Sequence, residues 1–196
     1  MDTMSREAVY KVLKTIMASG HFSTLEHASY TFAIEGVSRA LTHQLVRHRL
    51  ASYSQQSQRY VTYSEEPNFI IPPSIKNDRW ALQSFVDVNT ALFETYKSLT
   101  KLGIAGEDAR YLLPNAMETK IVVTMNVREL YDVFFTLRCC NRAQWEIRAL
   151  ANRMLELVEP TAPYIFMDAG PSCRRGPCPE GCMTCGEPRP RAPRRE

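Results

Sequence analysis

The spacing of apolar residues before the C-terminal region places the strongest constraint on how this 196-residue chain can fold. Apolar side chains recur at helical intervals in residues 5–19, 78–102 and 142–158. Residues 28–35 alternate between large apolar and other side chains, and residues 117–125 are rich in β-branched side chains, as strands are. The pattern predicts a body that contains both helices and strands.

Polar residues mark the ends of these elements. Ser38 can cap a further helix that runs to about Arg49, whereas residues 50–60 are so polar that they predict a loop. Asn126 and Glu129 form an Asn-x-x-Glu pattern, which resembles the capping box at the start of a helix. A helix is therefore expected to follow the strand that ends near residue 125.

The composition of the chain changes after Pro160. Residues 160–196 hold eight of the 12 prolines and four of the eight glycines. Both residues interrupt helices and strands, so regular structure is expected to end there. The chain is predicted to divide into a body, residues 1–165, and a tail rich in cysteine, proline and arginine, residues 166–196.

Charge and hydropathy exclude several classes of protein. The net charge of +3 comes from the end of the chain, since residues 170–196 contain six Arg and three Glu. The neutral body argues against binding of a nucleic-acid polymer, which needs a broad basic surface. No stretch reaches the about 18 apolar residues of a membrane span, and the first residues lack the apolar core of a signal peptide. We expect a cytoplasmic protein with no membrane partner, whose cysteines are thiols or metal ligands.

Residues 36–64 form an arginine-rich segment without acidic residues. The segment contains Arg39, Arg47, Arg49 and Arg59 but no lysine. A guanidinium group binds phosphate through two parallel hydrogen bonds, whereas lysine offers a point charge. The helix dipole explains a single arginine at a helix end. Four unpaired arginines interleaved with serines and glutamines predict instead an anionic ligand with a base or sugar, hence a nucleotide.

The string RHRLASYSQQSQRY, residues 47–60, resembles a motif of the flavin-dependent thymidylate synthases, Arg-His-Arg, seven residues, Ser. Similarity to this family continues, in the same order, in SGHFSTLEH, DARYLLP, TMNVREL and LRCCNRAQWEI, between residues 19 and 147. The resemblance implies an α+β fold with helices packed on an antiparallel or mixed sheet. It also implies a homotetramer with active sites at subunit interfaces, and makes residues 1–165 the catalytic domain.

The resemblance further implies a reaction and its cofactors. Members of the family methylate C5 of deoxyuridine monophosphate (dUMP) to give thymidylate (dTMP) in de novo thymidylate biosynthesis. The carbon donor is 5,10-methylenetetrahydrofolate, reduced FAD supplies the hydride, and NADPH regenerates the reduced flavin. The expected partners are therefore dUMP, the folate and NADPH.

Candidate site residues carry over position by position from the family's motifs. The positions that match dUMP-binding residues are Gln44, Leu45, Val46, Arg47, Gln55, Gln56, Ser57, Gln58, Arg59, Arg110 and Arg138. The positions that match FAD-binding residues are Ser23, Arg47, His48, Arg49, Gln55, Asn126, Val127, Arg128 and Asp132. The chain departs from the family's pattern at Gln55, where many members have Glu, and in one extra residue between Asn126 and Arg138.

Arg138 is the candidate catalytic residue, because it matches the arginine that acts on the N3 and carbonyl edge of the pyrimidine. An arginine is no base at neutral pH, so its expected role is to stabilise the negative charge that develops as C5 becomes nucleophilic. Ser57 is interpreted as a nucleotide ligand rather than a nucleophile, since no Ser-His-acid arrangement is readable. Cys139 and Cys140 are interpreted as packing thiols, with nucleophilic attack as the alternative.

The tail raises the question of a metal. Cys173, Cys178, Cys182 and Cys185 have the spacing C-x4-C-x3-C-x2-C, and the last pair resembles a zinc half-site. A structural zinc, a redox or iron–sulfur role and a metal-free basic tail all remain open. In each case the tail is expected to take no part in catalysis.

Two other functions remain open at the level of the sequence. An RNA-binding module could stack bases on Tyr53, Tyr60 and Tyr63, although the neutral body weighs against it. A different flavoenzyme is also compatible with the motifs. The lack of a glycine-rich dinucleotide fingerprint excludes only a Rossmann-type FAD site.

Overall fold

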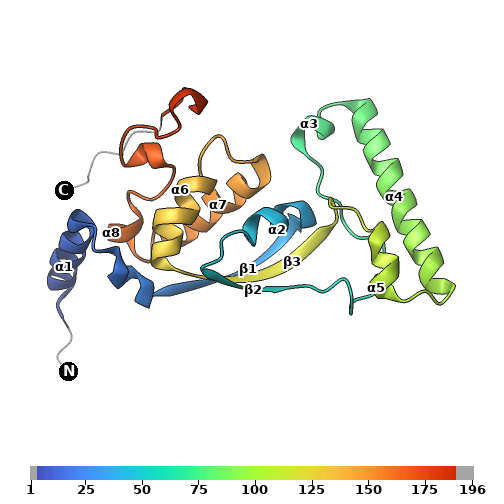
Figure 1. The fold of residues 1–196 in the computed structure, drawn as a ribbon, viewed down its shortest axis with the longest axis horizontal. Helices are drawn as coiled ribbons and strands as arrows, with labels where there is room; N and C mark the ends of the chain where they lie inside the picture. Colours follow the sequence, from blue (N-terminus) through green and yellow to red (C-terminus); the bar gives the residue numbers. More distant parts are fainter. Residues whose placement is uncertain (1–3, 189–196) are drawn as a thin grey trace. The chain divides into compact units, whose positions relative to one another are not determined.

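A computed structural model describes residues 4–188 and mixes helices with strands, which confirms the predicted α+β class (Figure 1). Among the short helices, η3 is a π-helix and the other η elements are 3₁₀-helices. In chain order the elements are α1 (Arg6–Ser19), η1 (Phe22–His27), β1 (Ser29–Ser38), α2 (Arg39–Leu45), β2 (Ala51–Gln55), α3 (Pro73–Lys76), α4 (Arg79–Lys101), α5 (Gly106–Ala109), η2 (Arg110–Leu112), β3 (Glu118–Asn126), η3 (Glu129–Phe134), α6 (Phe135–Arg138), α7 (Trp145–Val158), α8 (Pro163–Phe166), η4 (Ser172–Arg174) and η5 (Gly181–Met183).

Several predicted helix ends are confirmed, because side chains at these ends satisfy backbone groups that the helix leaves free. The Ser38 hydroxyl accepts a hydrogen bond of 3.0 Å from a backbone N–H in the first turn of α2. The Asp78 carboxylate accepts two such bonds of 2.9 Å at the start of α4. α1 stops at Gly20, whose φ of 70° lies in the left-handed region that favours glycine. α2 is shorter than predicted and ends at Leu45.

The three strands form one sheet in the order β1-β3-β2. β1 and β3 are antiparallel, since backbone hydrogen bonds join the residues flanking the start of one to those flanking the end of the other. The prediction of a loop over residues 50–60 is wrong, because β2 covers Ala51–Gln55. Side chains of β2 alternate between half-buried and exposed, so the period of a strand is present. This alternation is difficult to recognise in the sequence, because the segment contains serines and a glutamine and few large apolar residues.

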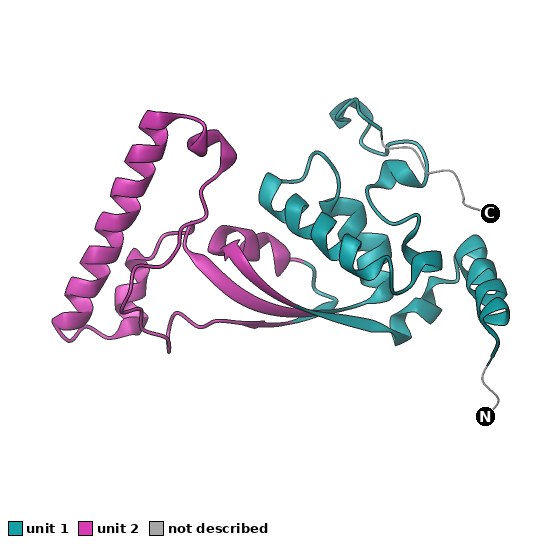
Figure 2. Cartoon of the chain, turned by 180° about the vertical axis from the view of Figure 1, so that it is seen from behind, with its two compact units in different colours: residues 1–32, 48–52, 124–196 teal, residues 33–47, 53–123 magenta. Residues whose placement is uncertain are grey.

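The chain divides into two compact units (Figure 2). Unit 1 contains the residues up to Phe32, residues 48–52 and those from Thr124 onward, and unit 2 contains residues 33–47 and 53–123. Each strand therefore contributes residues to both units. The candidate site residues divide as well. Most FAD-binding candidates and Arg138 belong to unit 1, and most dUMP-binding candidates belong to unit 2.

The core of unit 1 is built around α6 and α7, which lie side by side (Figure 1). Phe134, Phe135 and Phe166 are buried, and the last two rings meet edge to face. The helix predicted over residues 142–158 is confirmed as α7, in which Leu157 is half-exposed. The residues that α7 buries are Glu146, Ile147, Ala151, Met154 and Val158.

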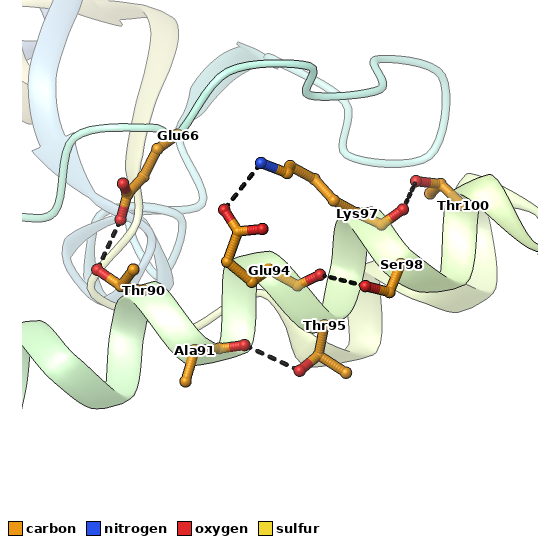
Figure 3. Close-up of polar contacts among 8 residues, drawn as sticks. All are labelled: Glu66, Thr90, Ala91, Glu94, Thr95, Lys97, Ser98 and Thr100. Atoms are coloured by element: carbon orange, nitrogen blue, oxygen red, sulfur yellow. Dashed lines mark hydrogen bonds and ion pairs between the residues drawn. The ribbon is translucent and has the colours of Figure 1, made fainter.

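The core of unit 2 lies against α4. Phe93 and Tyr96 are fully buried there, and Tyr63, Phe69, Leu99, Leu112 and Leu113 pack against them. Polar contacts run along the same helix, where Thr90 bonds to the Glu66 carboxylate at 2.7 Å and Lys97 pairs with Glu94 at 2.8 Å (Figure 3).

Short helices continue after Pro160, contrary to the prediction that regular structure ends there. α8, η4 and η5 all lie beyond this proline. Ile165, Phe166 and Ala169 are buried, so the start of the tail belongs to the core of unit 1. α8 lies beside α1, and the ring centroids of Tyr10 and Tyr164 are 4.3 Å apart.

Over residues 4–188, none of the helices combines the length and the apolar character that a membrane crossing requires.

Candidate functional site

Three side chains of unit 1 form a hydrogen-bonded set, which we call the Glu–His–Arg cluster. Nε of Arg138, at the end of α6, donates to Nε2 of His48 at 2.9 Å. The other ring nitrogen of His48, Nδ1, lies 3.1 Å from Oε1 of Glu129, the first residue of η3. The side chains of His48 and Glu129 are buried, at 4% and 3% exposure. Three residues distant in sequence therefore meet in one buried network.

The polarity of these hydrogen bonds fixes the protonation of the cluster. Nε of an arginine always carries a hydrogen, so Nε2 of His48 must be the acceptor. The one proton of the neutral ring then sits on Nδ1, which donates to the Glu129 carboxylate. Burial lowers the pKa of His48 most strongly, while the hydrogen bond to Glu129 opposes this change and the charge of Arg138 reinforces it. The cluster thus consists of a carboxylate, a neutral imidazole and a cation.

The surroundings of the cluster hold its parts in place. The Asn126 side chain accepts a hydrogen bond of 2.8 Å from the backbone N–H of Glu129. The ring of Phe134 meets the ring of His48 edge-on, with 5.0 Å between centroids. The predicted capping box is therefore half formed. Asn126 caps the helix as predicted, but the Glu129 side chain bonds to His48, which lies 81 residues away in sequence.

The remaining FAD-binding candidates of unit 1 differ in exposure. Arg128 is exposed and forms an ion pair with Glu26 of η1, the helix that also carries Ser23. Arg49 is exposed as well, whereas Val127 is buried and can meet a ligand only through its backbone. The structure thus brings the Ser23 helix next to Arg128, although these residues are about a hundred positions apart.

The π-helix η3 lies between Asn126 and Arg138, where the resemblance to the family implies one extra residue. A π turn contains one residue more than an α turn, so it absorbs an inserted residue without rotating the helix that follows. Asp132 lies within η3 and accepts a hydrogen bond of 3.1 Å from Arg175 of the tail. Arg175 also lies over the ring of Tyr131, at 4.6 Å from its centroid. Sequence reasoning missed this contact between the tail and a candidate FAD residue.

In unit 2 the glutamine candidates are held by neighbouring side chains. The Gln55 amide donates to the hydroxyls of Thr42 and Thr119 at 3.1 and 3.4 Å. The Gln58 amide lies 3.4 Å from the sulfur of Met117. Both amides are therefore oriented by contacts within unit 2, and their remaining donors and acceptors suit a polar ligand.

Ser57 stabilises a turn. Its hydroxyl oxygen accepts hydrogen bonds from the backbone N–H groups of Arg59 and Tyr60, at 3.1 and 3.3 Å. Among the residues that the structure describes, no carboxylate or imidazole hydrogen-bonds to this hydroxyl. This geometry agrees with the interpretation of Ser57 as a ligand rather than an activated nucleophile.

Two arginines of unit 2, Arg59 and Arg110, bond to Glu107, and the charge of Arg110 acts on a third, Arg39. Nε of Arg59 donates to the Glu107 carboxylate at 2.6 Å, and Nε of Arg110 donates to the Glu107 backbone carbonyl at 3.0 Å. Arg39, one of the four arginines of the segment but not among the positions carried over from the family, donates to the Gln56 carbonyl at 3.3 Å. Burial lowers the pKa of Arg39, with a smaller contribution of the same sign from the charge of Arg110. The prediction that all arginines of the segment lack a partner is therefore wrong for Arg59.

The end of α2 and the residues after it show both extremes of exposure. Leu45 is fully buried, and its carbonyl accepts a hydrogen bond of 2.8 Å from the Tyr53 hydroxyl. Val46 and Arg47 are exposed. Within residues 4–188, Arg47 and Arg49 form no ion pair with a carboxylate. Both guanidinium groups are therefore placed at the surface, and the buried His48 lies between them in the sequence.

The tail lines a cavity of about 250 Å³ in unit 1, next to the end of α6. Arg138, Cys140, Cys173, Cys178 and Cys185 are among its lining residues. Even so, nowhere in residues 4–188 do three His, Cys, Asp or Glu side chains meet in a way that could hold a metal ion. The four-cysteine zinc site considered from the spacing is thus not formed in the structure, where Cys173, Cys178 and Cys185 line the cavity and Cys182 is exposed. Cys139 is fully buried, as predicted for a packing thiol.

Similarity to known proteins extends over nearly the whole chain. Residues 1–164 match the model of a family described as "Thymidylate synthase complementing protein". The flavin-dependent thymidylate synthase of Geobacter sulfurreducens is 57% identical over 188 residues, which are 95% of this chain and 80% of that protein. Those of Clostridium tetani and Pyrococcus furiosus are 50% and 49% identical, over 94% and 93% of this chain and 80% of each relative.

Proposed function

Because the chain belongs to the family of flavin-dependent thymidylate synthases, we propose that it is an enzyme that methylates dUMP to dTMP. The observation that carries the proposal is the 57% identity to a named synthase over 95% of the chain. The family predicted from five short motifs is confirmed by this match. We propose 5,10-methylenetetrahydrofolate as the carbon donor and NADPH as the reductant. When bound, FAD supplies the hydride that completes the methyl group.

The donor set of unit 1 suits FAD. Arg49 and Arg128 are exposed, and their planar guanidinium groups match the geometry of a diphosphate. Ser23 lies on the helix that Arg128 contacts, and the Asn126 side chain is oriented by Glu129. We propose that these residues hold the cofactor, together with the backbone of Val127 and of His48, whose buried ring is engaged by Glu129 and Arg138.

The donor set of unit 2 suits the phosphate of dUMP. Arg59 and Arg110 both bond to Glu107, and the charge of Arg110 acts on Arg39. Within residues 4–188, Glu107 is the only carboxylate that pairs with any of the three, and it pairs with Arg59. The group therefore carries excess positive charge. The ion pair between Arg59 and Glu107 is half-exposed and so contributes little to stability, which lets a phosphate displace the carboxylate. The amides of Gln55 and Gln58 offer donors and acceptors for the sugar or the base.

Arg138 is proposed to act on the pyrimidine ring by stabilising negative charge. Its Nε is engaged by His48, which fixes the plane of the guanidinium group. A cation held in a fixed orientation stabilises developing charge without the cost of reorganisation. Arg138 is the residue on which the rate of the chemical step is proposed to depend most.

The proposed function is tested by the conversion of dUMP to dTMP by the purified protein. The protein is expected to contain FAD, and to form dTMP only when dUMP, 5,10-methylenetetrahydrofolate and NADPH are all present. The native assembly is expected to be a homotetramer, which sedimentation velocity measures. A correctly folded, flavin-loaded protein that forms no dTMP overturns the proposal.

A further inference from the structure

We propose that Glu129 is a positioning residue for the methylation reaction: it holds His48 as the Nδ1–H tautomer, and His48 in turn holds the side chain of Arg138. Glu129 was noted in the sequence only as part of a capping pattern, and it is not placed against the substrate. The inference rests on the proposed function for one point, the action of Arg138 on the pyrimidine. The contacts within the Glu–His–Arg cluster are independent of that point.

The inference follows from the direction of each hydrogen bond. Arg138 can only donate, so its contact of 2.9 Å with His48 requires an unprotonated Nε2. The Glu129 carboxylate lies 3.1 Å from Nδ1 and, while it is ionised, can only accept a hydrogen bond. It therefore stabilises the tautomer of His48 that carries its proton on Nδ1. Without this acceptor the proton can move to Nε2. Two donors would then face each other, and the Arg138 side chain would lose its support.

His48 and Glu129 are buried too deeply for water to replace a lost partner, whereas Arg138 is half-buried and lines the cavity beside the tail. Glu129 and His48 are at most 5% exposed, and the ring of Phe134 packs edge-on against the imidazole. A buried donor without an acceptor carries the full cost of its desolvation. The backbone of Glu129 is also fixed by the Asn126 side chain. The position of the carboxylate is therefore set by the start of η3, and the positions of His48 and Arg138 follow from it.

The same geometry makes the support of Arg138 sensitive to acid. The charged groups that act on the His48 ring are Glu129 and Arg138. Protonation of the ring removes the acceptor at Nε2 and places a second cation beside Arg138. Activity is therefore expected to require neutral His48. Because Glu129 stabilises the protonated ring, removing its charge is expected to move the acidic limb of the rate profile to lower pH.

The tautomer of His48 is the first test, and it does not require activity. In the FAD-loaded wild-type protein with ¹⁵N-labelled histidine, the His48 signals are assigned by their loss in His48→Gln. At neutral pH the expected spectrum shows a protonated Nδ1 and an unprotonated Nε2. In Glu129→Gln a mixture of tautomers is expected, because an amide can accept or donate. A wild-type ring protonated on Nε2 overturns the proposal.

The second test is kinetic and uses a matched control. Glu129→Gln is expected to lower kcat roughly 10- to 100-fold, as a small misplacement of a reacting group does, with KM for dUMP changed less than about twofold. The acidic limb of kcat should move to lower pH, which loss of packing alone would not cause. The control is Glu156→Gln, the same change in an exposed residue of α7 that pairs with Arg153 at 3.0 Å.

The outcomes separate this inference from the proposed function. A Glu129→Gln enzyme with wild-type kcat and an unshifted acidic limb overturns the positioning role while leaving the synthase activity in place. An equal loss in Glu156→Gln also overturns it. If the wild-type protein forms no dTMP, the proposed function fails, and the ¹⁵N spectrum still decides whether Glu129 sets the tautomer of His48. The spectrum of the wild-type protein also decides this if Glu129→Gln does not fold.

Discussion

Unit 1 and unit 2 present their charged candidates in opposite ways. In unit 1, His48 and Glu129 are nearly inaccessible to solvent, and each hydrogen bond of the Glu–His–Arg cluster has one possible direction. In unit 2, Arg59 and Glu107 are about half-exposed, and their ion pair is open to water and salt. The network in unit 1 fixes the orientation of Arg138. The exposed Arg59 of unit 2 is instead available to bind an anion from solution.

The difference teaches that the candidate arginines of the two units can serve different purposes. A buried, hydrogen-bonded charge is costly to disturb, and its orientation is retained as the reaction proceeds. An exposed charge is screened by salt and binds reversibly. We therefore expect substitutions in unit 1 to change the rate of the chemical step, and substitutions in unit 2 to change the binding of dUMP.

The largest effect is expected for Arg138→Ala. Loss of one preorganised donor typically costs about 10²- to 10³-fold in rate, so kcat should fall by this factor. FAD content should stay close to wild type, and the loss in kcat should exceed the loss in dUMP affinity, because the other dUMP-binding candidates are unchanged. Steady-state kinetics and the flavin absorbance spectrum measure both. Turnover within a few-fold of wild type would remove Arg138 from the chemical step and with it the contrast between the units.

A smaller effect, on binding rather than rate, is expected for Arg59→Ala. A hydrogen bond to a charged group contributes about 1.5–3 kcal/mol, so the Kd for dUMP should rise roughly 10- to 100-fold while kcat changes little. Arg59→Lys should recover part of the loss, because it keeps the charge without the bidentate geometry. Isothermal titration calorimetry measures these affinities.

Glu107→Gln is the matched control for that change. It removes the carboxylate that competes with phosphate for Arg59, so dUMP should bind up to about fivefold more tightly, the worth of an exposed ion pair. If Arg59→Ala, Arg59→Lys and Glu107→Gln all leave the affinity unchanged, the phosphate is bound elsewhere.

Ser57→Ala should have an effect of only a few-fold, on dUMP affinity. The hydroxyl stabilises a turn before Arg59 through two backbone N–H groups, and no hydrogen-bonded base within the described residues activates it. Measurable turnover should therefore remain. A folded Ser57→Ala protein with normal dUMP affinity and no activity would instead establish Ser57 as the nucleophile.

The smallest effect concerns stability against pH. The folded pKa of His48 lies below its value in the unfolded chain, so the unfolded chain binds more protons as the pH falls below about 6.5. The free energy of unfolding should therefore decrease toward acid, by at most about 1.4 kcal/mol per pH unit for one proton. Urea unfolding at several pH values measures this free energy, which should decrease less steeply toward acid in His48→Gln than in the wild-type protein. Equal slopes in the two proteins would show that the folded and unfolded chains bind the His48 proton equally, so that folding does not lower its pKa.

Much of the fold was predictable because its signals are local. Ser38, Asp78 and Gly20 mark helix ends through contacts with residues a few positions away. β2 was not predicted, because most of the side chains that alternate along it are small or polar. The π-helix η3 has no such local pattern, and only the extra residue before Arg138 pointed to an irregularity.

The candidate site was predictable as a list of residues but not as a set of contacts. The motif around His48 identified its neighbours in sequence, whereas its partners Glu129 and Arg138 lie 81 and 90 positions away. Arg59 pairs with Glu107, which lies 48 positions away and outside the arginine-rich segment. Such pairs depend on how the strands and helices pack, which one sequence does not encode locally. The roles proposed for these residues remain predictions.

The most direct test of the central claim is a single turnover of the reduced flavin. The purified protein with its FAD reduced is mixed, without oxygen, with dUMP and 5,10-methylenetetrahydrofolate, while flavin absorbance and dTMP are followed together. We predict that the flavin is reoxidised only when both compounds are present, with one dTMP formed per flavin, and about 10²- to 10³-fold more slowly in Arg138→Ala. Reoxidation without dTMP, or a flavin that stays reduced in the complete mixture, would contradict the account.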